Sequence, residues 1–180
     1  MVRRYYLVLL LLSLQAFCPL FAGQDLVRTI SELKARDVGY DGRKIRLTGE
    51  VSIDHRLGLI TCDKAELLMP EDSLTGKSLT PERIFLQKGV KLVLKDGSTL
   101  TSDEAEINCL ELTGVFTAVA PSRVVYTTFV EEEGKKLPVI TSSRAMHVAM
   151  KKDEKTSQYV LSDIQGEGAV CIQYQNGGKL

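Results

Sequence analysis

The stretch Thr61-Cys62-Asp63-Lys64-Ala65-Glu66-Leu67 decides the predicted fold, because the chain repeats it at a constant spacing. Thr101-Ser102-Asp103-Glu104-Ala105-Glu106-Ile107 lies 40 positions later, and Thr141-Ser142-Ser143-Arg144-Ala145 lies 40 positions beyond that. Self-similarity at a period of about 20–50 residues indicates a protein built from one repeated supersecondary unit. The repeat-motif residues are Thr61, Asp63, Ala65, Thr101, Asp103, Ala105, Thr141 and Ala145.

A glycine-led segment precedes this motif. Gly49–Ile53 and Gly89–Val93 alternate apolar and polar residues, and Gly168–Ile172 follows the pattern less closely. Alternation with a period of two predicts half-buried strands. We therefore predict hairpin units in which a strand begins at the glycine, turns near Arg56–Gly58 or Asp96-Gly97, and returns through Thr-x-Asp-x-Ala. The alanine is expected on a crowded inner face, and Thr and Asp are expected to point outward or to satisfy the turn. Such units bury their apolar faces only when they are stacked side by side.

The rest of the chain predicts further strands and one helix. Val124–Val130 and Leu137–Ile140 flank the charged segment Glu131–Lys136, which predicts a hairpin with a solvated tip. Asp25–Arg36 has apolar residues at helical spacing and predicts a short amphipathic helix. Strands are also predicted for Val160–Ile164 and Val170–Tyr174. A bulge would shift the inside-outside alternation by one residue. The alternation assigns to the inner face Val51, Ile53, Val90, Leu92, Leu94, Ile107, Val148 and Ile172.

The first 22 residues have the composition of a secretory signal peptide. Arg3 and Arg4 give a cationic start, and the segment Leu7–Leu14 is nearly all aliphatic. Small residues at Ala22 and Gly23 then precede a polar stretch, which is the order of regions in a cleaved leader. We predict cleavage before Gly23 and a periplasmic location.

An uncleaved N-terminal anchor in the inner membrane, facing the periplasm, is the alternative. A spanning helix needs about 20 apolar residues, and Gln15 and Pro19 interrupt this run. The predicted organisation is therefore a signal peptide at 1–22, a short helix and linker at 23–39, and one β domain at 40–180.

Charge and cysteine content narrow the classes of function. The chain has 23 basic and 23 acidic residues, whereas nucleic-acid binding needs a basic surface, so no nucleic-acid partner is predicted. Outside the leader there are three cysteines, Cys62, Cys109 and Cys171, without a CxxC pair. We interpret them as buried reduced thiols. One disulfide with a thiol left over is the alternative in an exported protein.

Residues suited to catalysis or metal binding are few. His55 lies at a predicted turn, where a surface position is expected, and His147 lies on a predicted strand as a partly buried polar residue. Neither has a second His, Cys or carboxylate at the spacing of a metal site. G-x-S-x-G, Walker and GxGxxG patterns are absent from the sequence. We predict no cofactor, no metal and no enzymatic activity, with an exported hydrolase as the minor alternative.

The repeat resembles the OstA-like family of lipopolysaccharide-transport proteins. The residues that carry the resemblance are Gly49, Val51, Ile53, Thr61, Asp63, Ala65, Gly89, Val93, Thr101, Asp103 and Ala105. It covers Tyr40–Asn108 well and Ile140–Leu180 loosely. The chain departs from the family pattern where Ser143 replaces Asp, in the long third hairpin, and in the helix before the sheet.

The resemblance implies an open, twisted β-jellyroll of hairpin repeats of about 40 residues. It also implies that the inner-face residues line a groove for acyl chains of lipopolysaccharide or lipooligosaccharide, on the way to the outer membrane. Partners would be the lipid and other jellyrolls, or a second copy, stacked by edge strands. The expected edge is Ala169–Tyr174, where the repeat stops in mid-unit. A structural or protein-interaction repeat protein without a lipid ligand is the alternative, and it would have a filled interior.

Overall fold

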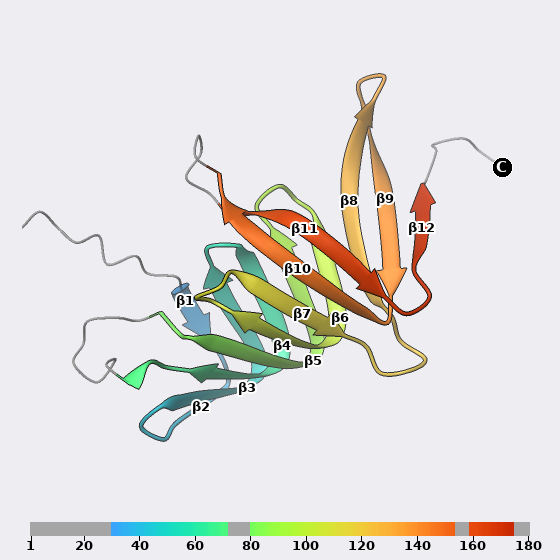
Figure 1. Cartoon of the computed structure of the whole chain (residues 1–180). Coiled ribbons are helices and arrows are strands. Elements are labelled where there is room, and N and C mark those ends of the chain that lie inside the picture. Colours follow the sequence, from blue (N-terminus) through green and yellow to red (C-terminus); the bar gives the residue numbers. More distant parts are fainter. Residues whose placement is uncertain (1–29, 72–79, 154–158, 175–180) are drawn as a thin grey trace, which may run out of the picture.

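The computed structural model describes residues 30–71, 80–153 and 159–174. All the long regular elements in these ranges are β-strands, which confirms the predicted all-β class (Figure 1). The strands are β1 Ile30–Lys34, β2 Asp37–Tyr40, β3 Lys44–His55, β4 Gly58–Leu68, β5 Arg83–Leu94, β6 Thr99–Asn108, β7 Thr113–Thr117, β8 Val124–Glu132, β9 Lys135–Ser143, β10 Ala145–Lys152, β11 Tyr159–Glu167 and β12 Cys171–Tyr174. They form one open antiparallel sheet.

This sheet is bent across its middle, so that it forms two limbs. In β6, residues 104–108 pair with β7, whereas residues 99–101 pair with β8. The lower limb contains β2, β7, β10, β11 and the halves of β3–β6 that are aligned with them. The upper limb contains β1, β8, β9, β12 and the other halves of β3–β6. Consecutive strands β1–β2, β7–β8, β9–β10 and β11–β12 are thus each the two parts of one bent strand.

The bends are produced by bulges in which two successive residues have positive φ. Gly49 and Glu50 lie opposite the single residue Asp63, and Lys88 and Gly89 lie opposite Asp103. Extra residues of this kind bend a strand and increase its twist. Glycine is needed at position 49 because a Cβ there would lie 2.9 Å from Cβ of Arg36. The prediction that these glycines begin strands is wrong, because they lie in the middle of long strands.

The inner faces of both limbs share one buried core. Leu47, Leu86 and Phe116 come from the lower limb and Ile53, Ile60 and Leu92 from the upper limb, all at 1% exposure or less. The repeat alanines Ala65 and Ala105 are buried in it, as predicted, while Thr61 and Thr101 alternate to the outer face. The two hairpins β3–β4 and β5–β6 turn at the predicted positions.

The third repeat is displaced by one residue relative to the sequence alignment. Ala105 and Met146 pair with Phe116 from opposite sides. Met146, and not Ala145, therefore lies in the same row of the sheet as Ala105. Arg144, not Ser143, lies opposite the bulge at Gly168, and its N–H donates to the carbonyls of Glu167 and Gly168. The predicted roles of Ala145 and Ser143 are therefore wrong. The β9–β10 strand contains one residue more before its bend, which a fixed 40-residue step cannot detect.

The predicted N-terminal helix is not observed where the structure describes it. Ile30–Lys34 is strand β1, which pairs with the upper half of β3, and Asp37–Tyr40 is β2, which pairs with the lower half. Within the described residues, the sheet is thus already present at Ile30, ten residues before Tyr40. Residues 25–29 of that prediction, and the predicted leader, lie outside the described residues. Tertiary pairing along the free edge of β3 outweighs a weak helical periodicity.

Candidate functional site

Seven of the eight predicted inner-face residues lie in a filled interior. Their exposures range from 0% for Ile53 to 5% for Leu94. The alternation therefore identified the correct face, but it did not show that the opposite limb covers these positions. In the centre of the molecule this interior is a packed core. The buried residues are Val51, Ile53, Val90, Leu92, Leu94, Ile107 and Val148.

The eighth residue, Ile172, is on the inner face but is 55% exposed. Ile172 pairs with Thr141 and Tyr174 pairs with Val139, and Val139 is buried, so both β12 side chains lie on the inner side of the upper limb. Tyr174 is 68% exposed. β10 and β11 run away from β8, β9 and β12, as Figure 1 shows, so the upper limb is uncovered there. We call this region, with Ile172 and Tyr174, the C-terminal opening.

A second opening lies at the other end of the sheet. Val38 pairs with the buried Leu47, and Tyr40 pairs with Ile45, which places both side chains on the inner face of the lower limb. They are 67% and 59% exposed. Leu33 of β1 pairs with Ile53 and is also exposed. We call Leu33, Val38 and Tyr40 the N-terminal opening. Apolar inner-face side chains are thus exposed at both ends of one filled core.

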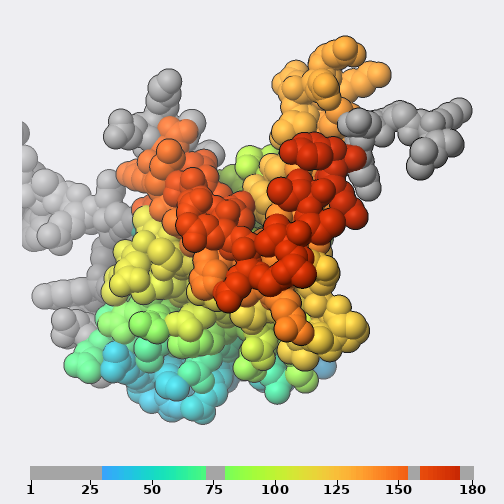
Figure 2. Space-filling model, turned by 45° about the vertical axis from the view of Figure 1, so that its right-hand side comes forward, coloured from blue at the N-terminus to red at the C-terminus, as the bar shows by residue number. Residues whose placement is uncertain are grey.

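A long hairpin extends the upper limb at the C-terminal opening. β8 and β9 continue past the last β6 pairing at Thr127, and they form the predicted hairpin with its charged tip. On its inner face Val130 pairs with Leu137. Figure 2 shows this hairpin rising above the body beside the surface formed by β11 and β12. The hairpin therefore enlarges the uncovered inner surface of the upper limb.

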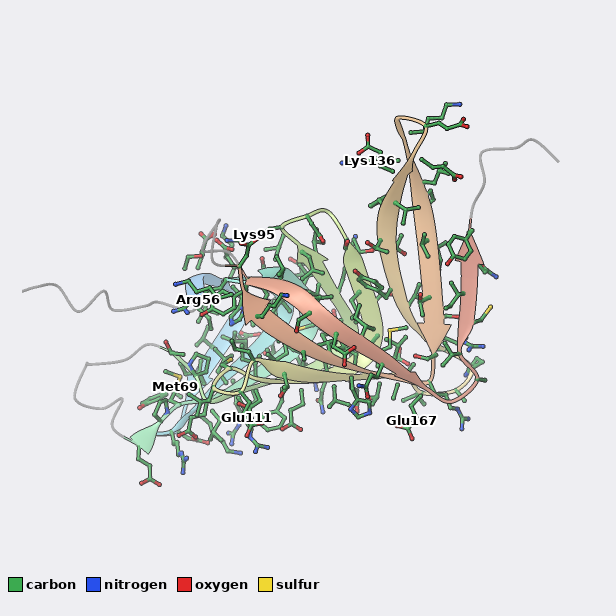
Figure 3. All side chains as sticks on the ribbon, turned by 45° about the horizontal axis from the view of Figure 1, so that its top comes forward. Arg56, Met69, Lys95, Glu111, Lys136 and Glu167 are labelled. Atoms are coloured by element: carbon green, nitrogen blue, oxygen red, sulfur yellow. The ribbon has the colours of Figure 1, made fainter. Side chains whose placement is uncertain are left out.

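A contact between two polar side chains joins the limbs at a corner that lies away from the C-terminal opening. Arg56, in the turn at the end of the upper limb, donates from Nη1 to Oη of Tyr159 at the start of β11 over 2.9 Å. Its guanidinium carbon also lies 5.4 Å from the centroid of the tyrosine ring. Figure 3 shows Arg56 at the end of the sheet opposite the hairpin that carries Lys136. A cavity of about 270 Å³ lies beside this contact, with walls from Leu57, Cys109, Leu110 and Leu112 among others.

His55 lies beneath this corner and is 3% exposed, which corrects the predicted surface position. Its Nδ1 accepts a hydrogen bond from the Leu57 N–H over 3.3 Å, and its Nε2 lies 4.0 Å from Sγ of Cys109. This arrangement requires Nε2 to carry the ring proton. Burial, with a smaller effect of Arg56, lowers the pKa of His55 to about 4, so the ring is neutral at pH 7. Burial raises the pKa of Cys109 to about 12, so its thiol stays protonated at pH 7.

The positions of the other histidine and of the three cysteines agree with the predictions only in part. His147 lies on β10, as predicted, but on the exposed outer face, with Nε2 3.4 Å from Glu167. Cys62 and Cys109 are buried and free, as predicted. Cys171 is also free but exposed, because it faces outward on an edge strand opposite Ser142. Its prediction as buried is wrong.

The outer face of the lower limb is covered by charged pairs. Lys44 and Arg46 both bind Glu66, and Arg83 binds Glu106. A hollow of about 410 Å³ lies among Arg46, Lys64, Glu66 and Phe85, and two of these residues, Arg46 and Glu66, form an ion pair. Within residues 30–71, 80–153 and 159–174 there is no cluster of three or more potential metal ligands. The same ranges contain no helix that is long and apolar enough to cross a membrane.

No protein-family model and no curated protein matches the chain.

Proposed function

We propose that this chain is a periplasmic protein that holds acyl chains of lipopolysaccharide or lipooligosaccharide at the open ends of its interior. The observation that carries the proposal is the exposure of apolar inner-face residues at both openings, namely 55% for Ile172 and 67% for Val38. Moving an acyl chain from water onto such a surface is favourable by about 0.8 kcal/mol per methylene. The polar headgroup would stay in solvent at the mouth of the opening.

The bent antiparallel sheet also supports the finer proposal of an open β-jellyroll that stacks end to end. The described strands make eight bent strands in an alternating order, beginning with β1–β2 and ending with β11–β12. Because this number is even, the first and last bent strands run in opposite directions. Copies stacked in one orientation would therefore pair these edges antiparallel, as in strand addition. The two openings would then join into one apolar surface.

A structural or protein-interaction role without a lipid is the second candidate. The filled centre favours it, since Leu92, Leu100 and Ile107 are at most 1% exposed and leave no slot between the limbs. In this case the openings would be covered by protein. Exposed apolar surface at an edge is suited to either partner.

Photocrosslinking at β12 separates the two candidates. Benzoylphenylalanine would replace Ile172, which faces inward, or Gln173, which faces outward on the same strand and serves as the matched control. The lipid proposal expects an adduct with lipopolysaccharide at position 172 in cells, and little at position 173. A protein adduct alone at position 172 would favour the second candidate. Equal lipid adducts at both positions would contradict binding to the inner face.

A further inference from the structure

The bent strands of the sheet alternate between two classes at the bend. Every second one has extra residues there, and the strands beside it have fewer. The extra residues are Gly49-Glu50 in β3, Lys88-Gly89 in β5, residues 118–123 between β7 and β8, and Gly168-Ala169 between β11 and β12. The residues that face them from the other class are Arg36, Asp63, Asp103 and Arg144. A bulge opposes two residues to one, so it needs a partner strand that lacks it.

The two end strands of the sheet belong to different classes. Among the described residues, β1–β2 pairs only with β3, and β11–β12 pairs only with β10 and β9. β1–β2 crosses the bend with Arg36, whereas β11–β12 has the bulge Gly168-Ala169. Joining unlike ends of two copies continues the alternation, whereas joining two C-terminal ends would place bulge against bulge. The two edges of the sheet are therefore complementary to each other and not to themselves.

We propose that β11–β12 of one copy pairs with β1–β2 of a second copy, in the register that places Arg36 opposite Gly168-Ala169. This register rests on the end-to-end stacking in the proposed function, and it identifies the residues that meet. Between β3 and β4, Ser52 lies two residues after the bulge and pairs with Thr61, two residues before Asp63. The same relation pairs Cys171 with Lys34, Ile172 with Leu33, and Glu167 with Asp37 of the second copy.

This register brings together apolar side chains that both openings leave exposed. Ile172, at 55% exposure, would lie beside Leu33, at 39%, on the inner face of the joined upper limbs. On the lower limb, Val38 would lie opposite Gly166 and next to the exposed Val170, whose side chain lies close to that glycine. The added strands extend the sheet without covering its inner face. The junction therefore still presents an apolar surface to acyl chains.

The same register places two carboxylates directly opposite each other on the outer face. Glu167 lies on this face with His147, and Asp37 lies on it opposite Thr48. Like charges at directly opposite positions destabilise an antiparallel pair. Stacking should therefore become stronger when one of these two charges is reversed, which no other register predicts for this pair.

Disulfide formation tests the register through the native thiol of Cys171, which is free and exposed. Directly opposite Cα atoms in an antiparallel pair are about 4.5–5.5 Å apart, within the range of a disulfide. Lys34→Cys should therefore give oligomers linked between position 34 and Cys171 under mild oxidation, with the link identified by mass spectrometry. Glu32→Cys is the matched control, because it removes the same ion pair with Lys34 but lies diagonal to Cys171, and it should link roughly tenfold less. Equal links at both positions, no link at position 34, or a preferred link between two Cys171 thiols overturns the register.

Charge reversal gives an independent test by sedimentation analysis. Asp37→Lys should raise the self-association constant roughly fivefold, because it replaces a repulsive pair by an attractive one. Glu111→Lys changes the net charge equally at the β6–β7 turn and should leave the constant unchanged. An unchanged or weaker association of Asp37→Lys overturns the pairing with Glu167.

The register and the proposed lipid ligand fail separately. A link between position 34 and Cys171 without any lipopolysaccharide adduct at Ile172 would refute the lipid and retain the register. A lipid adduct at Ile172 without that link would refute the register and retain the lipid.

Discussion

Leu92 and Ile172 occupy equivalent places in the strand alternation, yet their surroundings differ. Both face inward from the upper limb, but Leu92 is 1% exposed and Ile172 is 55% exposed. The lower limb covers Leu92, whereas β10 and β11 run away from Ile172 (Figure 1). A side chain that faces inward in this fold is therefore not always buried. Burial depends on whether the other limb lies opposite.

The largest expected effect is a charge placed in the covered region. Leu92→Asp should lower the free energy of unfolding by about 4 kcal/mol or abolish folding, because an unpaired carboxylate would be buried. Ile172→Asp leaves the carboxylate in water and should cost less than about 1 kcal/mol. Urea denaturation followed by circular dichroism measures both. Comparable losses for the two variants would mean that the C-terminal opening is covered in solution.

Acid should lower the free energy of unfolding through His55. The folded-state pKa is about 4, below the usual value of 6.5, so between these pH values the unfolded chain binds a proton that the folded chain does not. Stability is therefore retained above pH 6.5 and falls by about 3 kcal/mol as the pH drops to 4.

The control for this pH effect is a comparison of two histidine variants. His55→Gln should remove this part of the pH dependence, whereas His147→Gln, on the outer face, should leave it in place. Urea denaturation between pH 7 and pH 4 compares them with the parent chain. The same pH profile in His55→Gln would show that other groups cause the loss.

Two turn glycines show the same difference between a covered and an uncovered position, here in the backbone. A Cβ at Gly58 would lie 1.9 Å from the carbonyl oxygen of Val93, so Gly58→Ala should cost about 2 kcal/mol or more. Gly134, at the tip of the β8–β9 hairpin, has φ +74° but no heavy atom near its added Cβ, so Gly134→Ala should cost about 1 kcal/mol. Thermal unfolding of both variants gives the order, and the reverse order would contradict this packing.

The smallest expected effect on stability concerns the free edge at β12. Ile172→Lys should change the free energy of unfolding by less than about 0.5 kcal/mol, yet an inward-pointing charge hinders the addition of another strand. Sedimentation analysis should show self-association of the parent chain that is lost in this variant. Gln173→Lys points outward and should keep it. Persistent association of Ile172→Lys would exclude this edge as the contact.

Much of the local structure could be predicted from the sequence. Period-two alternation identified the β3–β4 and β5–β6 hairpins and the inner face, and the charged run Glu131–Lys136 identified the hairpin tip. The buried position of His55 was not predicted, because residues distant in the chain cover this last residue of β3. A signal was present in its alternation with Val51 and Ile53, which placed it on the same inner face.

The sequence by itself determined which residues alternate, where the turns lie and where glycine permits a bulge, because these depend on neighbours within a few positions. Only the tertiary structure decided which inner-face residues are covered, since this depends on the angle between two limbs that the bulges set. Pairing with a strand distant in the chain also decided the conformation of Ile30–Lys34, which joins the edge of β3 despite its helical spacing. It also explains Met146, whose row is fixed by pairing with Phe116 and not by the 40-residue step.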